Sequence, residues 1–220
     1  MYCYCLHPDW LELFNNNQSR VKNIFEIVEK DPMHVPSLHE VFKPFEIMPL
    51  DKIKVVIIGQ NPYNSAPGLA NGIAFSVPPE IGTSATLETI NQELYMSFGK
   101  GLSDCTLSNW VKQGVLLLNS CLTATLSKQD IGFSHDDVWT FFMENLVYWL
   151  SRNTTEIVFM LWGKRAERFM KLLKGTDSVV IKSPFPLSRN MKGDSFIGSN
   201  VFIKCNTALS KIGKQQIVWT

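Results

Sequence analysis

Amide, hydroxyl and aromatic side chains follow four short apolar runs of this chain, and they are the residues that could do chemistry. The four polar segments are Gly59–Asn64, Asn119, Trp162–Gly163 and Ser183–Ser188. No carboxylate adjoins them in sequence, so amides and hydroxyls are the polar groups that they offer to a ligand. Taken singly, each has a plainer interpretation, because Asn-Pro often begins a turn and Pro-Phe-Pro makes a stiff loop. Four such segments, each directly after an apolar run, favour a binding site.

The apolar runs predict the elements that must position these residues. Short, β-branched stretches predict buried parallel strands over residues 53–59, 115–119, 157–161 and 179–181. Apolar residues at helical spacing predict helices over residues 9–30, 87–98, 136–150, 164–173 and 201–211. Ser134 and Asp137 have the spacing of a capping box at the start of the third of these helices. The stretch 32–49 holds four prolines and is predicted to wrap the surface.

Strands that alternate with helices indicate an α/β fold. We expect residues 1–220 to form a single domain with three layers, α/β/α, around a central four-stranded parallel sheet. In such sheets, ligands bind beyond the carboxyl ends of the strands, which is where the four polar segments lie.

The composition is that of an ordinary globular enzyme, with 45% apolar and 19% charged residues. The net charge is +1, so a nucleic-acid partner would need a local basic surface. The chain shows neither a membrane-spanning apolar run nor the pattern of a secretory signal, and we expect an intracellular protein of the cytoplasm or nucleus. The five cysteines favour a reducing compartment. Cys3, Cys5 and His7 could be metal ligands, but no second pair has matching spacing, so we expect no metal site.

Five segments resemble the uracil-DNA glycosylases of the family that includes the bacterial and nuclear repair enzymes. KVVIIGQNPYNSAPGLANGIAFSV, from Lys54, is similar to the family's G-Q-D-P-Y-H motif and the G-L-x-F-S-V stretch that follows. GVLLLNSCL, from Gly114, is similar to the uracil-reading strand. FSHDDVW, from Phe133, and FMLWG, from Phe159, match further family segments, and SPFPLS, from Ser183, stands where the family has H-P-S-P-L-S. The matches keep the family's order from about residue 45 to Trp219.

The resemblance implies a base-binding site made by Gln60, Tyr63, Phe75 and Asn119. Asn119 would read the hydrogen-bonding edge of uracil, because its amide accepts from N3–H and donates to O4. Phe75 would stack on the base, Tyr63 would exclude the thymine methyl group, and Gln60 would add contacts to the pyrimidine. For the two aromatic residues the alternative is ordinary core packing.

The resemblance also implies contacts to DNA. Leu187 would be the wedge that enters the stack when a base leaves it. Ser188, with Arg189 or Lys192 nearby, would hold a phosphate, and Pro184 belongs to the same loop. Thr86, expected in a loop over residues 82–86, stands where the family has a phosphate clamp, although the prolines of that clamp are missing.

The catalytic positions depart from the family. Asn61 replaces the aspartate that supports the cationic sugar and the water, and Ser183 replaces the histidine that hydrogen-bonds the uracil anion. Asn64 replaces another histidine, and Phe185 replaces a small serine. Asparagine at position 61 has a parallel in the mismatch-specific and single-strand-selective relatives, so the change indicates weakened or redirected catalysis.

Three hypotheses follow. The first is a DNA glycosylase that hydrolyses the bond of flipped-out uracil, or of a modified pyrimidine, in base excision repair without metal or organic cofactor. The second is a catalytically impaired accessory protein that still binds DNA. The third, an interaction protein that does not touch DNA, is disfavoured by Asn119, Phe75 and Tyr63. The resemblance implies DNA as partner and a monomer, with a uracil-DNA glycosylase inhibitor protein or replication proteins as further partners.

Overall fold

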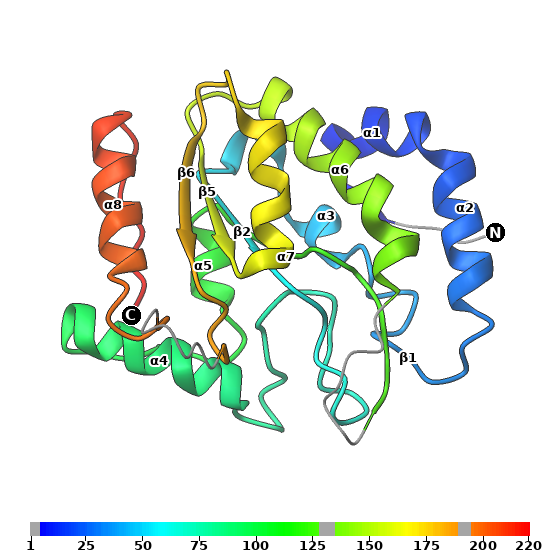
Figure 1. Cartoon of the computed structure of the whole chain (residues 1–220), viewed down its shortest axis with the longest axis horizontal. Coiled ribbons are helices and arrows are strands. Elements are labelled where there is room, and N and C mark those ends of the chain that lie inside the picture. Colours follow the sequence, from blue (N-terminus) through cyan, green and yellow to red (C-terminus); the bar gives the residue numbers. More distant parts are fainter. Residues whose placement is uncertain (1–4, 128–134, 189–194) are drawn as a thin grey trace.

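A four-stranded parallel sheet forms the centre of the molecule, as predicted. The computed structural model describes residues 5–127, 135–188 and 195–220. The strand order is β3-β2-β5-β6, with β2 at Val55–Gly59, β3 at Val115–Asn119, β5 at Val158–Trp162 and β6 at Val179–Ser183. Helices cover both faces of the sheet, so the expected three-layer α/β/α architecture is confirmed (Figure 1).

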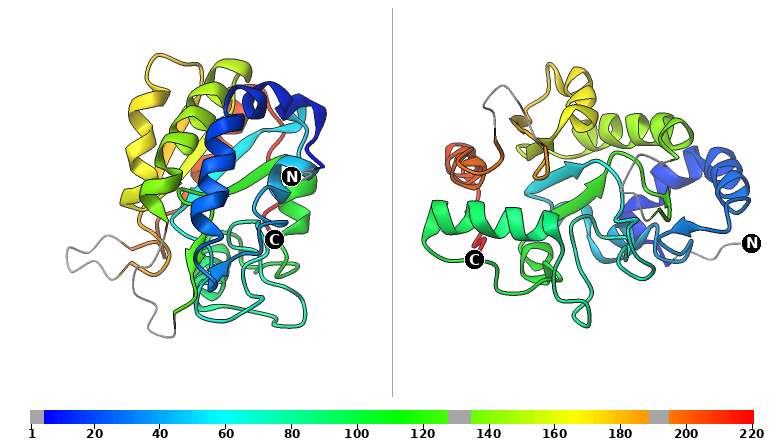
Figure 2. Two further views of the ribbon diagram at one scale, coloured as in Figure 1. Left: turned by 90° about the vertical axis from the view of Figure 1, so that its right-hand side faces the viewer. Right: turned by 60° about the horizontal axis from the view of Figure 1, so that its bottom comes forward.

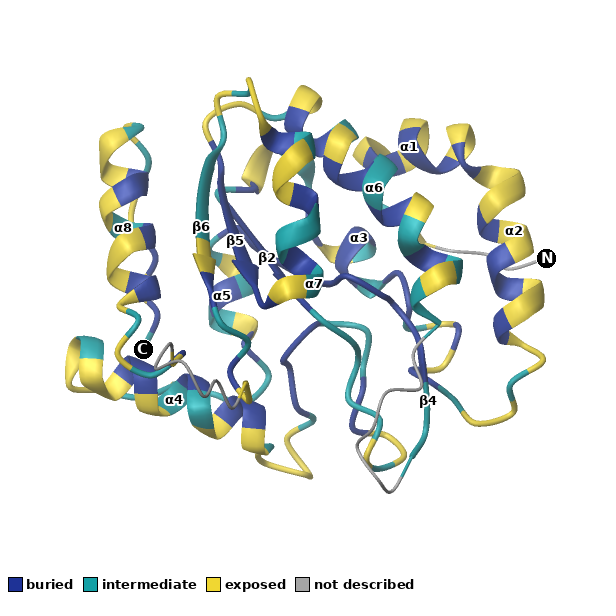
Figure 3. Cartoon of the chain, viewed as in Figure 1, coloured by how far each residue is buried: buried dark blue, intermediate teal, exposed yellow. Residues whose placement is uncertain are grey.

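Alternate residues of the strands enter two separate cores. Val56 and Leu116 pack under the helices of one face, whereas Val55 and Leu117 pack under those of the other. Because side chains alternate between the faces of a strand, both sets must be apolar, and this explains the unbroken apolar runs. Figure 3 shows these strands buried between helices that are exposed on their outer sides.

The first face is covered by the N-terminal helices and by the long helix α6. The helical elements of this face are η1 (Pro8–Trp10), α1 (Leu11–Asn16), α2 (Gln18–Val28), α3 (Lys43–Ile47), α6 (Asp136–Asn153), α7 (Lys164–Glu167) and η3 (Arg168–Leu173). The short η2 (Leu50–Lys52) precedes the first strand of the sheet.

Two details of this face differ from the sequence prediction. The single helix expected over residues 9–30 breaks at Asn17, whose Nδ2 donates to the Leu13 carbonyl at 2.9 Å and whose Oδ1 accepts from Asn145 at 3.0 Å. The break is stabilised by a contact with Asn145 of a distant helix, which the spacing of apolar residues cannot predict. Helix α6 is capped by His135 without a side-chain bond, and Ser134 of the expected capping box lies outside the described residues.

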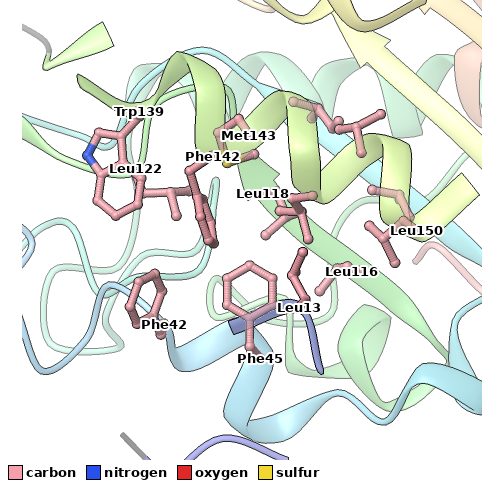
Figure 4. Packing of buried hydrophobic residues seen from close by; sticks show 14 of the residues in the cluster. Leu13, Phe42, Phe45, Leu116, Leu118, Leu122, Trp139, Phe142, Met143 and Leu150 are labelled. Atoms are coloured by element: carbon pink, nitrogen blue, oxygen red, sulfur yellow. The ribbon is translucent and has the colours of Figure 1, made fainter. Parts of the chain in front are cut away.

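The proline-containing stretch 32–49 does not merely wrap the surface. Phe42 and Phe45 are fully buried, and Figure 4 shows them packed with Leu13, Leu116 and Phe142. The prediction was wrong because prolines mark breaks in regular structure and not the exposure of the residues between them.

The second face is covered by α4 (Ala85–Phe98), α5 (Ser108–Lys112) and α8 (Val201–Lys211). Helix α4 begins two residues before the predicted start, because the Ser84 hydroxyl accepts from the Leu87 N–H at 3.1 Å. Thr86 therefore lies in the first turn of a helix and not in the expected loop.

Beyond the carboxyl ends of the strands, a second small sheet supports the connecting loops (Figure 2). It pairs β1 (His34–Val35) with β4 (Ala124–Thr125) in antiparallel fashion. Of the helices in the described ranges, none is both long and apolar enough to cross a membrane.

Candidate active site

A cavity of about 400 Å³ lies beyond the carboxyl ends of β2 and β3. The register pairs Gly59 with Asn119, so these two strands end at the same level. The cavity collects residues from four separate parts of the chain that the sequence had singled out. Those that line it are Gln60, Asn61, Tyr63, Phe75, Thr86, Asn119, Leu187 and Ser188.

One wall of the cavity, formed by Asn119, Phe75 and Tyr63, depends on a glycine at the end of β2. A Cβ at Gly59 would lie 2.4 Å from a ring carbon of Phe75 and 3.0 Å from Oδ1 of Asn119. Glycine therefore lets the ring and the amide meet directly above the strand. Within the described residues no protein group hydrogen-bonds to the amide of Asn119, although this residue is only 8% exposed. A nearly buried amide with both ends available to a cavity is suited to a planar ligand that offers one donor and one acceptor.

Phe75 is held in place from behind. Its backbone adopts a left-handed conformation with φ of 67°, which a bulky residue rarely takes, and its ring packs against Trp162 at 4.8 Å. The surrounding fold thus maintains a strained backbone that turns this ring toward the cavity.

Tyr63 is fixed through its hydroxyl group. The hydroxyl donates to the Phe75 carbonyl at 3.1 Å and accepts from the Ser84 hydroxyl at 2.8 Å. Burial raises the pKa of Tyr63 to about 12 despite hydrogen bonds with Ser84 and Thr86, so the phenol is neutral. Thr86 is buried behind Tyr63, so it is placed to orient this ring.

Sequence reasoning missed Ser84 and Arg165. Ser84 carried a signal, since serine just before an apolar helical run often caps a helix. Arg165 carried none, because it lies 104 residues from its partner Asn61. The Arg165 Nη1 donates to Asn61 Oδ1 at 2.9 Å, and a guanidinium has only donors, so the oxygen end of the Asn61 amide is the one it holds.

The other departure in the first motif, Asn64, anchors the loop. Its Nδ2 donates to the Thr125 carbonyl at 3.0 Å, and its own carbonyl accepts from the Ser127 N–H at 2.8 Å. Asn64 thereby ties the polar segment after β2 to the end of β4.

Ser183 does not line the cavity beyond β2 and β3. It is the last residue of β6, is 5% exposed, and its hydroxyl donates to the Pro184 carbonyl at 3.1 Å. With Pro184 it lines a second cavity of about 870 Å³, which also contains the cations Lys164, Lys182 and Lys204. Gln60, Phe185 and Ser188 line both cavities and so form the boundary between them.

The loop after β6 presents Leu187 outward, with 47% of the residue exposed. A turn in which the Ser188 N–H donates to the Phe185 carbonyl at 2.8 Å shapes this loop. Leu187 is therefore an exposed apolar side chain in the lining of the cavity. Arg189 and Lys192, expected next to it, lie outside the described residues, as does Cys3 of the alternative metal site.

Comparison with known proteins connects these features to one family. A family model described as the uracil DNA glycosylase superfamily matches residues 45–210. The uracil-DNA glycosylase of Lactiplantibacillus plantarum is 35% identical, with 97% of this chain and 94% of the relative aligned. The uracil-DNA glycosylase of Limosilactobacillus reuteri is 34% identical, with the same coverage of both chains.

Solved structures agree with the sequence comparison. The crystal structure of mimivirus uracil-DNA glycosylase has a TM-score of 0.85 and 26% identity, and the match covers 98% of this chain and 87% of that one. A variant of that viral protein in complex with UGI has a TM-score of 0.86 and 26% identity, with 98% and 89% covered. A protein from Nitratifractor salsuginis, at 17% identity and a TM-score of 0.64, shares the fold.

Proposed function

Because the chain belongs to the uracil-DNA glycosylase superfamily, we propose that it hydrolyses the N-glycosidic bond of uracil, or of a modified pyrimidine, in DNA. The base must leave the duplex to reach a cavity of this kind. The role fits base excision repair, in which removal of the base is the first step.

The single observation that carries this proposal is the amide of Asn119. It stands nearly buried beside Phe75 with no hydrogen bond to a described protein group. Uracil offers a donor at N3 and an acceptor at O4, which are the two partners that such an amide lacks. Cytosine offers the opposite pattern, so binding it would leave buried polar groups unpaired.

The aromatic residues would complete the recognition of a pyrimidine. Phe75 supplies a fixed face for stacking, and Tyr63, held by Ser84, stands as a rigid wall where a methyl group at C5 would arrive. Gln60 adds polar contacts at the boundary with the second cavity.

Contacts to DNA would surround this cavity. Leu187 would fill the space left by the flipped base, while Ser188 and Arg189 would hold the strand beside it. Thr86 is buried, so it would act through Tyr63 and not on a phosphate. Lys164, Lys182 and Lys204 line the second cavity together with one carboxylate, Glu167, which pairs with Lys182, so the cavity keeps the local positive charge that the net charge of the chain does not reveal. An inhibitor protein of the UGI type, which binds a variant of the mimivirus relative, would cover the same face.

Catalysis would be weaker than in relatives that carry aspartate. Asn61 is neutral and cannot offset the positive charge that develops on the sugar, a loss that typically costs about a hundred- to a thousandfold in rate. Ser183 lines the second cavity and would not donate to the departing base. We therefore propose a slow glycosylase whose base recognition is intact.

These same two residues favour the alternative, a DNA-binding accessory protein that has lost catalysis. The test is single-turnover incubation of the full chain with labelled DNA that contains one uracil, followed by alkali to break the strand at abasic sites. Matched DNA with thymine at that position is the control. We expect breaks at uracil only, accumulating slowly. Retained DNA binding without breaks at uracil or at modified pyrimidines would support the accessory role instead.

A further inference from the structure

A sharp turn at the end of β5 places Arg165 next to Asn61, on the side of the cavity where the reaction is proposed to occur. Gly163, with φ of 90°, connects β5 to α7, and α7 packs against β2. A Cβ at Gly163 would lie 2.7 Å from Gln60 Nε2 and 2.9 Å from Phe185 Cβ, so glycine is needed for this approach. The turn brings the Arg165 guanidinium within 2.9 Å of Asn61.

This contact determines which end of the Asn61 amide is available to a ligand in the cavity. The guanidinium can only donate, so it takes the amide oxygen and leaves Nδ2 as the group that serves the ligand side. Asn61 is then a donor toward the cavity, whereas an aspartate at this position would be an acceptor with a negative charge.

We propose that Arg165 is a positioning residue that holds the amide of Asn61 with its N–H groups toward the reaction centre. The inference rests on the proposed glycosylase function of this cavity. In this arrangement Nδ2 donates to the oxygen of the attacking water and leaves its other lone pair to form the C1′–O bond as the C1′–N1 bond breaks. The amide takes no proton, so the water loses its proton to solvent and the departing base takes one up. The same guanidinium would form an ion pair with a carboxylate at position 61 and would cancel most of its charge.

Two neighbouring ion pairs involve other cations than Arg165. Asp136 of α6 pairs with Arg168 at 3.3 Å, and Glu167 pairs with Lys182 at 3.6 Å. The charges of Asp136, Arg165 and Arg168 act on the pKa of the thiol of Cys121, which lies two residues beyond Asn119. Burial, the largest cause, raises the pKa of that thiol to about 12, so the thiol contributes no charge.

The test is a cycle of four proteins: wild type, R165M, N61D and the double variant N61D/R165M. Methionine keeps much of the arginine stem and removes the donors and the charge. With Asn61 present, R165M should lower kcat on uracil DNA by about tenfold to a hundredfold with KM little changed, because the amide loses its fixed orientation. In the N61D background, R165M should raise kcat, because the carboxylate regains its charge. R165K in the Asn61 background should recover part of the loss.

The opposite signs distinguish positioning from a merely structural role. If R165M changes kcat by the same factor and in the same direction in both backgrounds, the inference is wrong. R152M, which removes an exposed arginine at the far end of α6, is the matched control and should leave kcat unchanged.

A second measurement does not depend on catalysis. The pKa of the carboxyl at position 61, followed by carbon-13 NMR, should be about 1 to 3 units lower in N61D than in N61D/R165M, since a nearby opposite charge has an effect of that size. Equal pKa values would overturn the inference even if none of the proteins cleaves DNA. Absence of cleavage together with a lowered pKa would instead count against the proposed glycosylase function.

Discussion

The side of the cavity expected to bind the base keeps the residues of the family pattern, whereas the side expected to catalyse bond cleavage does not. On the recognition side, Asn119, Phe75 and Tyr63 are held by Gly59 and Ser84 in a geometry suited to a pyrimidine. On the reaction side, Asn61 is neutral and accepts a hydrogen bond from Arg165, and Ser183 lines another cavity. We propose that selectivity for the base and the rate of bond cleavage depend on separate groups of this cavity, so that the first is kept while the second weakens.

The largest expected effect comes from the recognition side. N119D removes the donor that faces O4 of uracil and leaves an acceptor that suits the amino group of cytosine. Cleavage at uracil should fall by about a hundredfold or more, because a buried polar pair is lost, and preference should move toward cytosine. Single-turnover rates on both DNAs measure this change. N16D, at an exposed position of α1, is the control, and an unchanged preference in folded N119D would remove the assignment.

A substitution of Leu187 tests whether this side chain holds the base stack of duplex DNA open. L187A should lower cleavage of duplex DNA by about tenfold or more, since the wedge offsets an unstacking cost of a few kcal/mol. Single-stranded DNA has no stack to hold open, so its cleavage should change little. L11A, another exposed leucine, is the control. Equal losses on single and double strands would show that Leu187 is not a wedge.

Restoring a single family residue at position 61 or 183 should change the cleavage rate little. N61D alone should raise cleavage by less than about tenfold, because Arg165 pairs with the new carboxylate. S183H should add little to N61D, since the side chain of residue 183 lines the second cavity. A large gain from S183H would mean that this segment moves into the base cavity when DNA binds.

The smallest expected effect is on thermal stability, through the hydrogen bonds of Asp31 with Met33 and Thr125. Burial opposes ionisation of Asp31, but hydrogen bonds from the Thr125 hydroxyl at 2.6 Å and the Met33 N–H at 2.9 Å outweigh it and lower the pKa. The folded state therefore favours the carboxylate, and its contribution is present above the ordinary pKa of 3.8 and lost as pH falls below it.

D31N should consequently lower the Tm at pH 7 by about 2–4 °C, the shift that 1 kcal/mol produces in a domain of this size. The difference from wild type should shrink near pH 3. Thermal unfolding at the two pH values measures it, with D51N at an exposed position as control. A difference that persists unchanged at pH 3 would show that ionisation of Asp31 is not its cause.

Local patterns in the sequence predicted the sheet and the meeting of Asn119, Phe75 and Tyr63 at one cavity. Strands buried on both faces appear as continuous apolar runs, and the polar residues after them met at one edge as parallel topology requires. The contact between Arg165 and Asn61 and the break at Asn17 depend on partners more than 100 residues away, which no local pattern encodes. Ser183 lines the second cavity and not the first, which no local pattern in the sequence indicates.

The central claim, intact recognition with weakened chemistry, is tested most directly by one ratio. Single-turnover cleavage by the wild-type protein is measured on duplexes that differ only in carrying uracil, thymine or cytosine at one position. The account predicts a slow rate at uracil that still exceeds the rates at thymine and cytosine by about a hundredfold or more, as a site built around buried hydrogen bonds should show. A slow rate at uracil with similar rates at the other two bases would contradict it.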